Sequence, residues 1–94
     1  MYFFAKQFEE AIDAFKEAIS LKENYYEAYN FLGIVFGILG LDKKAIEAYK
    51  KAIEINPDLY DGYVGLGIIH YKLGEPEKAI EYYKKALKLI LTAT

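Results

Sequence analysis

The sequence predicts an all-α fold, a stack of antiparallel helix hairpins, and three observations lead to that prediction. The chain repeats itself with a period of 34 residues, apolar residues recur at helical spacing within each repeat, and helix-breaking residues stand at matching places in successive repeats. A period of this length is typical of architectures in which one small helical unit stacks on the next. At 94 residues, the chain is expected to form a single domain, residues 1–94.

The repeat is visible when residues 26–59 are aligned with residues 60–93. Of the 34 aligned positions, 15 are identical. One period earlier, residues 11–19 match residues 45–53 at six positions. The chain therefore divides into a partial repeat over 1–25, a full repeat over 26–59 and a second full repeat over 60–94.

The first element is expected to be one continuous helix from about Tyr2 or Phe3 to Leu21. Position 6 is a lysine, whereas the later repeats carry Gly40 and Gly74 at the equivalent positions, so no helix breaker interrupts this segment. It corresponds mostly to the second helix of its repeat. The aromatic residues at its start are expected to lack the partner helix that covers them in a full repeat. These residues are Tyr2, Phe3, Phe4 and Phe8.

Each full repeat is expected to form two helices, which gives five helices in all. Gly40 and Asp42 separate the helices of the first full repeat, and Gly74 and Pro76 separate those of the second. Asn56 and Pro57 end the unit between them. Asp42 has the side chain of a helix N-cap, and proline suits the first helical turn. The chain is either a whole gene product or a segment cut or designed from a longer array, and the half repeat at the start and the missing capping helix favour a segment.

These residues resemble the tetratricopeptide repeat. The family's characteristic positions are filled in the first full repeat by Tyr29, Leu32, Gly33, Phe36, Ala45, Tyr49, Ala52 and Pro57. In the second they are filled by Tyr63, Leu66, Gly67, His70, Ala79, Tyr83, Ala86 and Leu91, so that a histidine replaces an aromatic residue and the closing proline is missing. Small residues let two helices approach, and aromatic residues fill the space between them. The resemblance implies a right-handed superhelix, here a solenoid fragment, that serves as a protein-binding scaffold.

The resemblance also implies a ligand site. In the family, the first helix of each repeat lines a concave groove that holds extended or helical peptides. The contact positions correspond here to Glu27, Asn30, Ile34, Gly37, Ile38, Asp61, Val64, Ile68, Tyr71 and Lys72. This set is apolar in its middle and acidic at one rim. It therefore suits a peptide or amphipathic helix of a partner better than the acidic C-terminal tails that some family members bind.

An alternative function is structural self-assembly. Ile34, Val35 and Ile38 belong to a helix that is apolar almost all round, and a helix of that kind is normally buried on every side. Identical chains could fill the groove and the ends of the stack, either as a closed homodimer or as a head-to-tail solenoid. The expected partner is therefore a protein or a peptide, and a homo-oligomer is the alternative.

Catalytic residues, cofactors and metal sites are not expected. The chain has no cysteine and a single histidine, whereas a zinc site needs three or four converging ligands. His70 is expected to be packed or half-buried, because its neighbours on the helix are Leu66, Gly67, Leu73 and Gly74. General-base catalysis would also need a carboxylate or nucleophile beside it, and none is evident. Gly65 and Gly67 do not complete a G-x-G-x-x-G motif, because His70 stands where its last glycine would be. The sequence therefore predicts a protein that is not an enzyme.

The amino-acid composition argues against nucleic acid and membranes as binding partners. With 12 basic against 14 acidic residues, and no arginine among the basic ones, nucleic acid is not expected as a ligand. The longest uncharged run, residues 28–41, is shorter than the roughly twenty apolar residues of a spanning helix, so no membrane insertion is expected. The start of the chain lacks a secretory signal pattern, which makes the cytoplasm the default location. The high use of lysine, glutamate, tyrosine and isoleucine resembles thermophile composition.

Overall fold

The computed structural model describes residues 2–92, and the side chains of residues 6–92, as five α-helices joined by short turns. The helices are α1 (Tyr2–Leu21), α2 (Tyr26–Ile38), α3 (Asp42–Ile55), α4 (Tyr60–Lys72) and α5 (Pro76–Thr92). No strand occurs between residues 2 and 92. The predicted all-α class is confirmed, and so is the continuous first helix. Phe8 is half-buried, while the side chains of Tyr2, Phe3 and Phe4 lie outside the described part.

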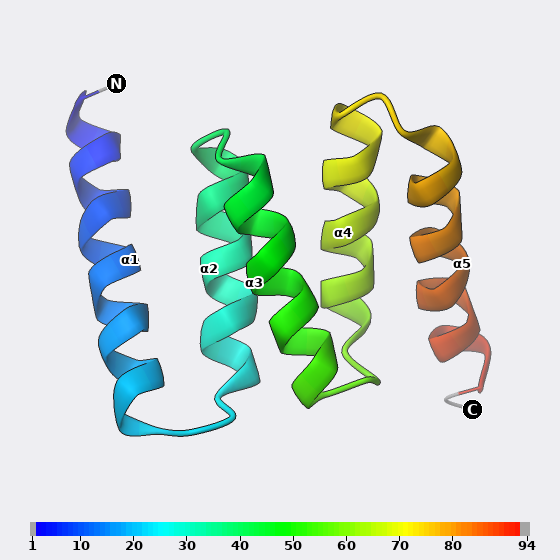
Figure 1. Ribbon diagram of the computed structural model, residues 1–94, viewed down its shortest axis with the longest axis horizontal. Helices are drawn as coiled ribbons and strands as arrows, with labels where there is room; N and C mark the ends of the chain where they lie inside the picture. Colours follow the sequence, from blue (N-terminus) through cyan, green and yellow to red (C-terminus); the bar gives the residue numbers. More distant parts are fainter. Residues whose placement is uncertain (1, 93–94) are drawn as a thin grey trace.

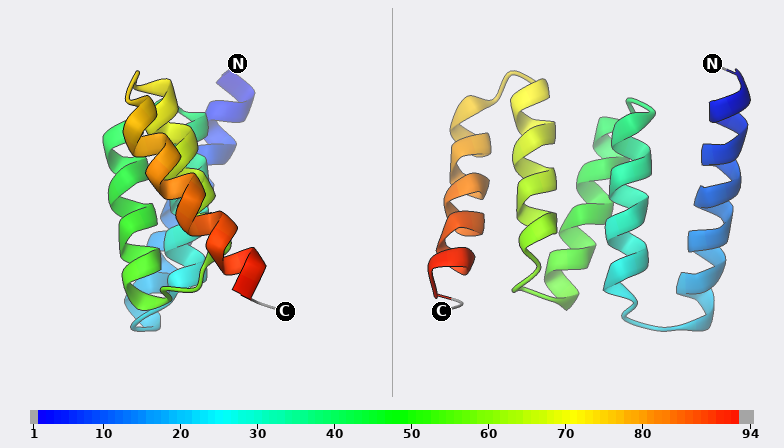
Figure 2. Two further views of the ribbon diagram at one scale, coloured as in Figure 1. Left: turned by 90° about the vertical axis from the view of Figure 1, so that its right-hand side faces the viewer. Right: turned by 180° about the vertical axis from the view of Figure 1, so that it is seen from behind.

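The helices stand side by side in chain order, so that α1 and α5 form opposite ends of the stack (Figure 1). Helices α2 and α3 form one antiparallel hairpin, and α4 and α5 form the next, as the views from the end and from behind also show (Figure 2). Helix α3 contacts both α2 and α4, and α2 contacts α4 as well. These contacts join the two hairpins into one solenoid fragment.

The helix breaks lie where the sequence predicts them. Gly40 and Gly74 have φ angles of +78° and +76°, in the left-handed region that glycine adopts without strain. After each glycine the chain makes the same hydrogen bond, from the Leu41 amide to the Phe36 carbonyl and from the Glu75 amide to the His70 carbonyl, both at 2.9 Å. The two hairpin turns therefore share one geometry.

Asp42 is not the N-cap of α3, and that prediction is wrong. The cap position is Leu41, which makes no side-chain cap hydrogen bond, and Asp42 is the first helical residue. Its carboxylate instead accepts a hydrogen bond from Lys72 Nζ at 3.2 Å, and the same ammonium group donates to the Gly37 carbonyl at 3.4 Å. The Asp42 carboxylate thus pairs with a lysine of the next hairpin, and this pair links the two repeats.

The core lies between α2, α3 and α4. Its buried members are Leu32, Phe36, Ala45, Ala48, Tyr49, Leu66 and Ile69. Glycines make room for the aromatic ring at its centre: a Cβ atom on Gly33 would lie 2.8 Å from the Tyr49 ring, and one on Gly65 would lie closer still. The predicted packing of small residues against aromatic rings is confirmed at both helix crossings of Tyr49.

His70 is buried as expected, but it has a carboxylate partner that the sequence analysis missed. Its Nδ1 lies 2.7 Å from Glu75 Oε1, and its ring stacks on Tyr82 with centroids 5.4 Å apart. Because a carboxylate only accepts, the proton of this hydrogen bond belongs to Nδ1. The hydrogen bond lowers the pKa of the Glu75 carboxyl, and the charge of Lys78 lowers it further. The missed partner lies five residues away, beyond the turn at Gly74.

Within residues 2–92, no helix combines the length and the apolarity that crossing a membrane requires.

A candidate binding groove between α2 and α4

A pocket of about 360 Å³ lies between α2 and α4. Five of the ten predicted ligand-binding residues line it, namely Ile34, Gly37, Ile38, Ile68 and Lys72. The other lining residues are Tyr49, Gly65 and Ile69. Equivalent positions on the first helix of each repeat thus face one space, which we call the groove.

The wall of the groove is made of large apolar side chains that remain accessible. Ile34, Ile38 and Ile68 are 39%, 60% and 49% exposed. Gly37 and Gly65 also line the pocket, and because neither has a side chain, the space between α2 and α4 stays open at these positions. The groove therefore presents a continuous apolar surface to solvent.

Two predicted carboxylates lie beyond one end of the groove, and neither of them lines the pocket. Glu27 and Asp61 lie in the first turns of α2 and α4, and these two helices run in the same direction (Figure 1), so both carboxylates stand at the same end. Both residues are exposed. Burial raises the pKa of the Tyr49 phenol, and the negative charge of Asp61 raises it further. Asp61 lies one helical turn before Gly65, whose backbone packs against the Tyr49 ring, so this carboxylate adjoins the base of the groove.

At the opposite end of the groove, Lys72 forms an ion pair with an aspartate. Lys72 pairs with Asp42 at 3.2 Å across the junction of the two hairpins. Tyr71, beside it, is 69% exposed and does not line the pocket. The net charge of the groove is therefore concentrated at the end that Glu27 and Asp61 mark.

Two further predicted residues do not reach the pocket. Val64 is half-buried, and Asn30 is only 8% exposed. The Asn30 Oδ1 atom is buried and has no hydrogen-bond partner among the described residues. Tyr49 and Gly65 were not predicted to belong to the groove, but in the structure both line it.

Comparison with protein families gives matches along most of the chain. A family model described as "Tetratricopeptide repeat" matches residues 60–90, and one described as "TPR repeat" matches residues 1–40 and 38–74. No curated protein matches the chain.

Solved structures with the same arrangement of helices include several of MamA. One, "Crystal structure of MamA", is 37% identical and superposes with a TM-score of 0.91, covering 97% of this chain and 53% of the MamA chain. A second, "Crystal structure of MamA protein", is 39% identical with a TM-score of 0.84, covering 93% of this chain and 48% of the other. A third, "MamA MSR-1 C2", is 19% identical with a TM-score of 0.87 and covers 99% and 53%, so it supports the fold alone. The present chain spans about half the length of these chains.

Proposed function

The chain belongs to the tetratricopeptide repeat family, and from that premise we propose that it is a scaffold whose groove binds a peptide or an amphipathic helix of a partner protein. Membership of this family supports a role in protein interaction or assembly. The single observation that carries the finer proposal is the exposure of Ile34, Ile38 and Ile68 around one pocket. Isolated exposed apolar residues are ordinary, whereas a cluster of them in a concave surface is typical of a binding site.

The charges of the groove restrict the ligand. Three isoleucines offer contacts for an apolar ridge, such as residues at i, i+3 and i+7 of a helix. Glu27 and Asp61 at one end favour a lysine or arginine at the corresponding end of the ligand, because opposite charges steer the encounter and fix its direction. Lys72 is paired with Asp42 and leaves little free positive charge for an acidic tail.

Selection of displayed peptides on the immobilised protein tests this proposal. We expect the selected peptides to carry apolar residues at helical spacing with a basic residue near one end. Ile68→Lys should weaken their binding at least tenfold, which corresponds to about 1.4 kcal/mol, because it places an unpaired charge against an apolar ridge. Binding is measured by titration calorimetry.

The matched control is Ile80→Lys on α5. Ile80 and Ile68 have similar exposure, 53% and 49%, but Ile80 lies outside the groove. The control should therefore leave peptide affinity unchanged. Equal losses for both variants, or no enrichment of any peptide family, would contradict the proposal.

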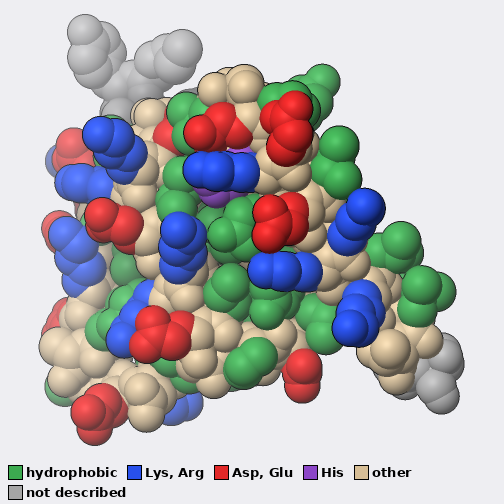
Figure 3. Space-filling view, turned by 45° about the vertical axis from the view of Figure 1, so that its right-hand side comes forward, with side chains coloured by type: hydrophobic (Ala, Val, Ile, Leu, Met, Phe, Trp, Pro, Cys, Tyr) green, Lys and Arg blue, Asp and Glu red, His purple; other side chains and the backbone are tan. Residues whose placement is uncertain are grey.

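A second candidate function is self-assembly, and one comparison between the two repeats favours it. Tyr49 is 6% exposed because α4 covers it, whereas the equivalent Tyr83 on α5 is 38% exposed. The residues around Tyr83 are also open, since Ile80, Leu87 and Ile90 are 53%, 54% and 50% exposed. Figure 3 shows apolar side chains reaching the surface between charged ones on this side of the molecule. The α5 face therefore has the composition of a helix interface.

Light scattering over a concentration series tests self-assembly. If identical chains cover the α5 face, the mass should rise with concentration, and Leu87→Lys should return it to that of a monomer. If they fill the groove, Ile34→Lys should do so instead. A monomer mass for the unmodified chain at all concentrations excludes self-assembly and leaves the peptide-binding proposal.

A further inference from the structure

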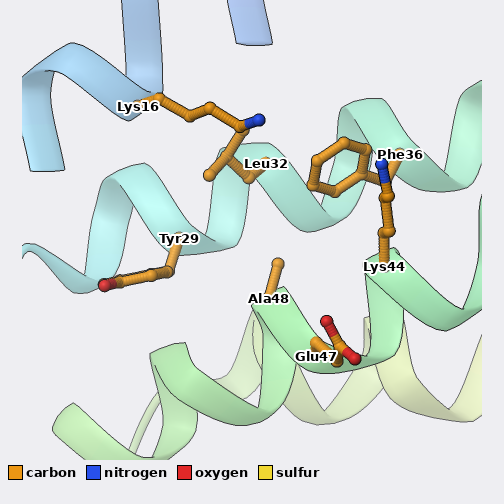
Figure 4. Close-up of a pocket in the computed structure, with 7 residues that line it drawn as sticks. All are labelled: Lys16, Tyr29, Leu32, Phe36, Lys44, Glu47 and Ala48. Atoms are coloured by element: carbon orange, nitrogen blue, oxygen red, sulfur yellow. The ribbon is translucent and has the colours of Figure 1, made fainter. Parts of the chain in front are cut away.

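A second cavity, of about 290 Å³, opens among α1, α2 and α3, and none of its residues lines the groove. Its size is at the lower limit for a small-ligand pocket and matches a single ring better than a large ligand. Its lining residues are Lys16, Tyr29, Leu32, Phe36, Lys44, Glu47 and Ala48 (Figure 4).

The small side chain of Ala48 accounts for the cavity. One repeat later, the equivalent residue is Tyr82, and its ring stacks on His70 with centroids 5.4 Å apart and planes inclined by 13°. His70 is in turn the equivalent of Phe36, which lines the cavity. The second repeat thus holds an aromatic ring where the first repeat has open space.

The surroundings of Tyr82 support this equivalence. Burial raises the pKa of the Tyr82 phenol, and the negative charges of Glu81 and of ionised Tyr63 raise it further. Glu81 and Tyr63 correspond to Glu47 and Tyr29, which both line the cavity. The cavity is therefore bounded by the same positions that surround a tyrosine ring in the second repeat.

The floor of the cavity is apolar and its rim carries charge. Leu32, Phe36 and Ala48 are buried. Figure 4 shows Lys16 and Lys44 extending from α1 and α3 toward the side of the cavity that Leu32 and Phe36 form. The Lys44 ammonium lies 5.8 Å from the centre of the Phe36 ring. Because two lysines and one glutamate border the cavity, its rim favours an anion.

We propose that this cavity binds a single aromatic ring that bears a carboxylate, with the ring stacked on Phe36 and the carboxylate beside Lys16 and Lys44. The ring would take the place that the Tyr82 ring occupies one repeat later. Free aromatic carboxylic acids have this chemistry, and so does a protein segment in which an acidic residue follows a tyrosine. The site is separate from the groove and does not depend on the proposed function of the groove.

Titration of the isotope-labelled protein, followed by NMR, tests the proposal with two probes. The first probe is 4-hydroxyphenylacetate, and the second is the blocked dipeptide acetyl-Tyr-Asp-amide. We expect chemical-shift changes centred on Leu32, Phe36 and Ala48, with a dissociation constant on the order of 1 mM for a probe of this size. Binding of the acid points to a free small molecule as the ligand, and binding of the dipeptide alone points to a protein segment. If neither probe shifts these residues, the proposal is wrong.

Two variants of Ala48 provide the decisive comparison. Ala48→Tyr should fill the cavity from within, abolish the shifts and raise the Tm by about 4 °C, because the new ring stacks on Phe36. Ala48→Leu fills part of the same space and serves as the blocking variant if the tyrosine does not fold. The matched control is Ala14→Tyr, one repeat earlier on the exposed side of α1, which should change neither binding nor Tm. Undiminished binding to a folded Ala48 variant would overturn the proposal.

Replacing both lysines tests the anionic part of the ligand. Lys16→Ala combined with Lys44→Ala should weaken binding of the probe that binds by about threefold at low salt, and added salt should reduce that difference. Equal affinity in the two proteins would overturn the assignment of the carboxylate to this rim.

Discussion

The ring of Tyr49 occupies the space in which a Cβ atom of Gly65 would stand, and a Cβ atom of Gly33 would lie only 2.8 Å from the same ring. One aromatic residue of α3 therefore sets the separation of α2 and α4. This separation in turn sets the width of the groove. Packing between repeats and the geometry of the candidate site thus depend on the same contact.

Gly65→Ala should destabilise the protein by about 2 kcal/mol, because overpacking against the Tyr49 ring outweighs the gain in helix propensity. The free energy of unfolding in urea measures this loss. Gly37→Ala is the control, since its Cβ atom would meet only the flexible end of Ile69, at 3.3 Å. That variant should be neutral or slightly more stable, and an equal loss in both variants would contradict the role given to Tyr49.

The stability of the α4–α5 hairpin should depend on the ionisation of Glu75. The hydrogen bond from His70 and the charge of Lys78 lower the pKa of Glu75 below its usual value of 4.5 in the folded state. A group of this kind stabilises the fold above its unfolded pKa, and its contribution is lost as the pH falls through the folded pKa. The Tm of the unmodified protein should therefore decrease as the pH falls below about 4.5. In Glu75→Gln this decrease should be smaller, because the variant has no carboxyl group to protonate at this position. Glu77→Gln removes a nearby carboxylate that does not bond to His70, and it should keep the acid-dependent decrease.

The Lys72–Asp42 pair should contribute little to stability. Its side chains are 45% and 22% exposed, and partly exposed ion pairs contribute less than about 1 kcal/mol. Lys72→Met should therefore lower the free energy of unfolding by no more than that amount, and the difference should shrink in high salt. A loss well above this range would indicate that the pair, and not the Tyr49 packing, holds the two hairpins together.

The attachment of α1 should depend strongly on one pair of aromatic rings, in addition to the packing of Ile12 and Ile19 against the core. Phe15 on α1 stacks on Phe31 of α2, with centroids 5.3 Å apart and planes inclined by 10°. Among the described helices, α1 contacts α2 alone. Phe15→Ala should therefore speed amide hydrogen exchange across residues 6–21 while leaving α4 and α5 protected. Uniform acceleration along the chain would show instead that α1 unfolds together with the rest.

The sequence predicts the architecture well because the residues that define the repeat act mainly on the backbone near them. Gly40 and Gly74 end helices by their own backbone preference, and the small residues Gly33 and Gly67 recur at one position of the repeat, each paired with a tyrosine at a second fixed position. The single long α1 follows from a lysine where the other repeats have glycine. These features need no knowledge of distant contacts.

The features that sequence analysis missed all depend on pairs of residues that the fold brings together. Asp42 has the chemistry of an N-cap, but its carboxylate meets Lys72 from the next hairpin. His70 finds Glu75 only because the chain turns at Gly74. The cavity at Ala48 becomes evident when its neighbours are compared with those of Tyr82. Five of the predicted groove residues line one pocket, because equivalent positions of α2 and α4 face the same space. Asn30 was also predicted to contact the ligand, but in the structure it is buried.

The most direct test of the central claim is to map a selected peptide onto the surface of the protein by NMR. If the groove is the binding site, the largest chemical-shift changes should occur at Ile34, Ile38 and Ile68. Changes centred on Ile80, Leu87 and Ile90 would place the peptide on the α5 face and contradict the account.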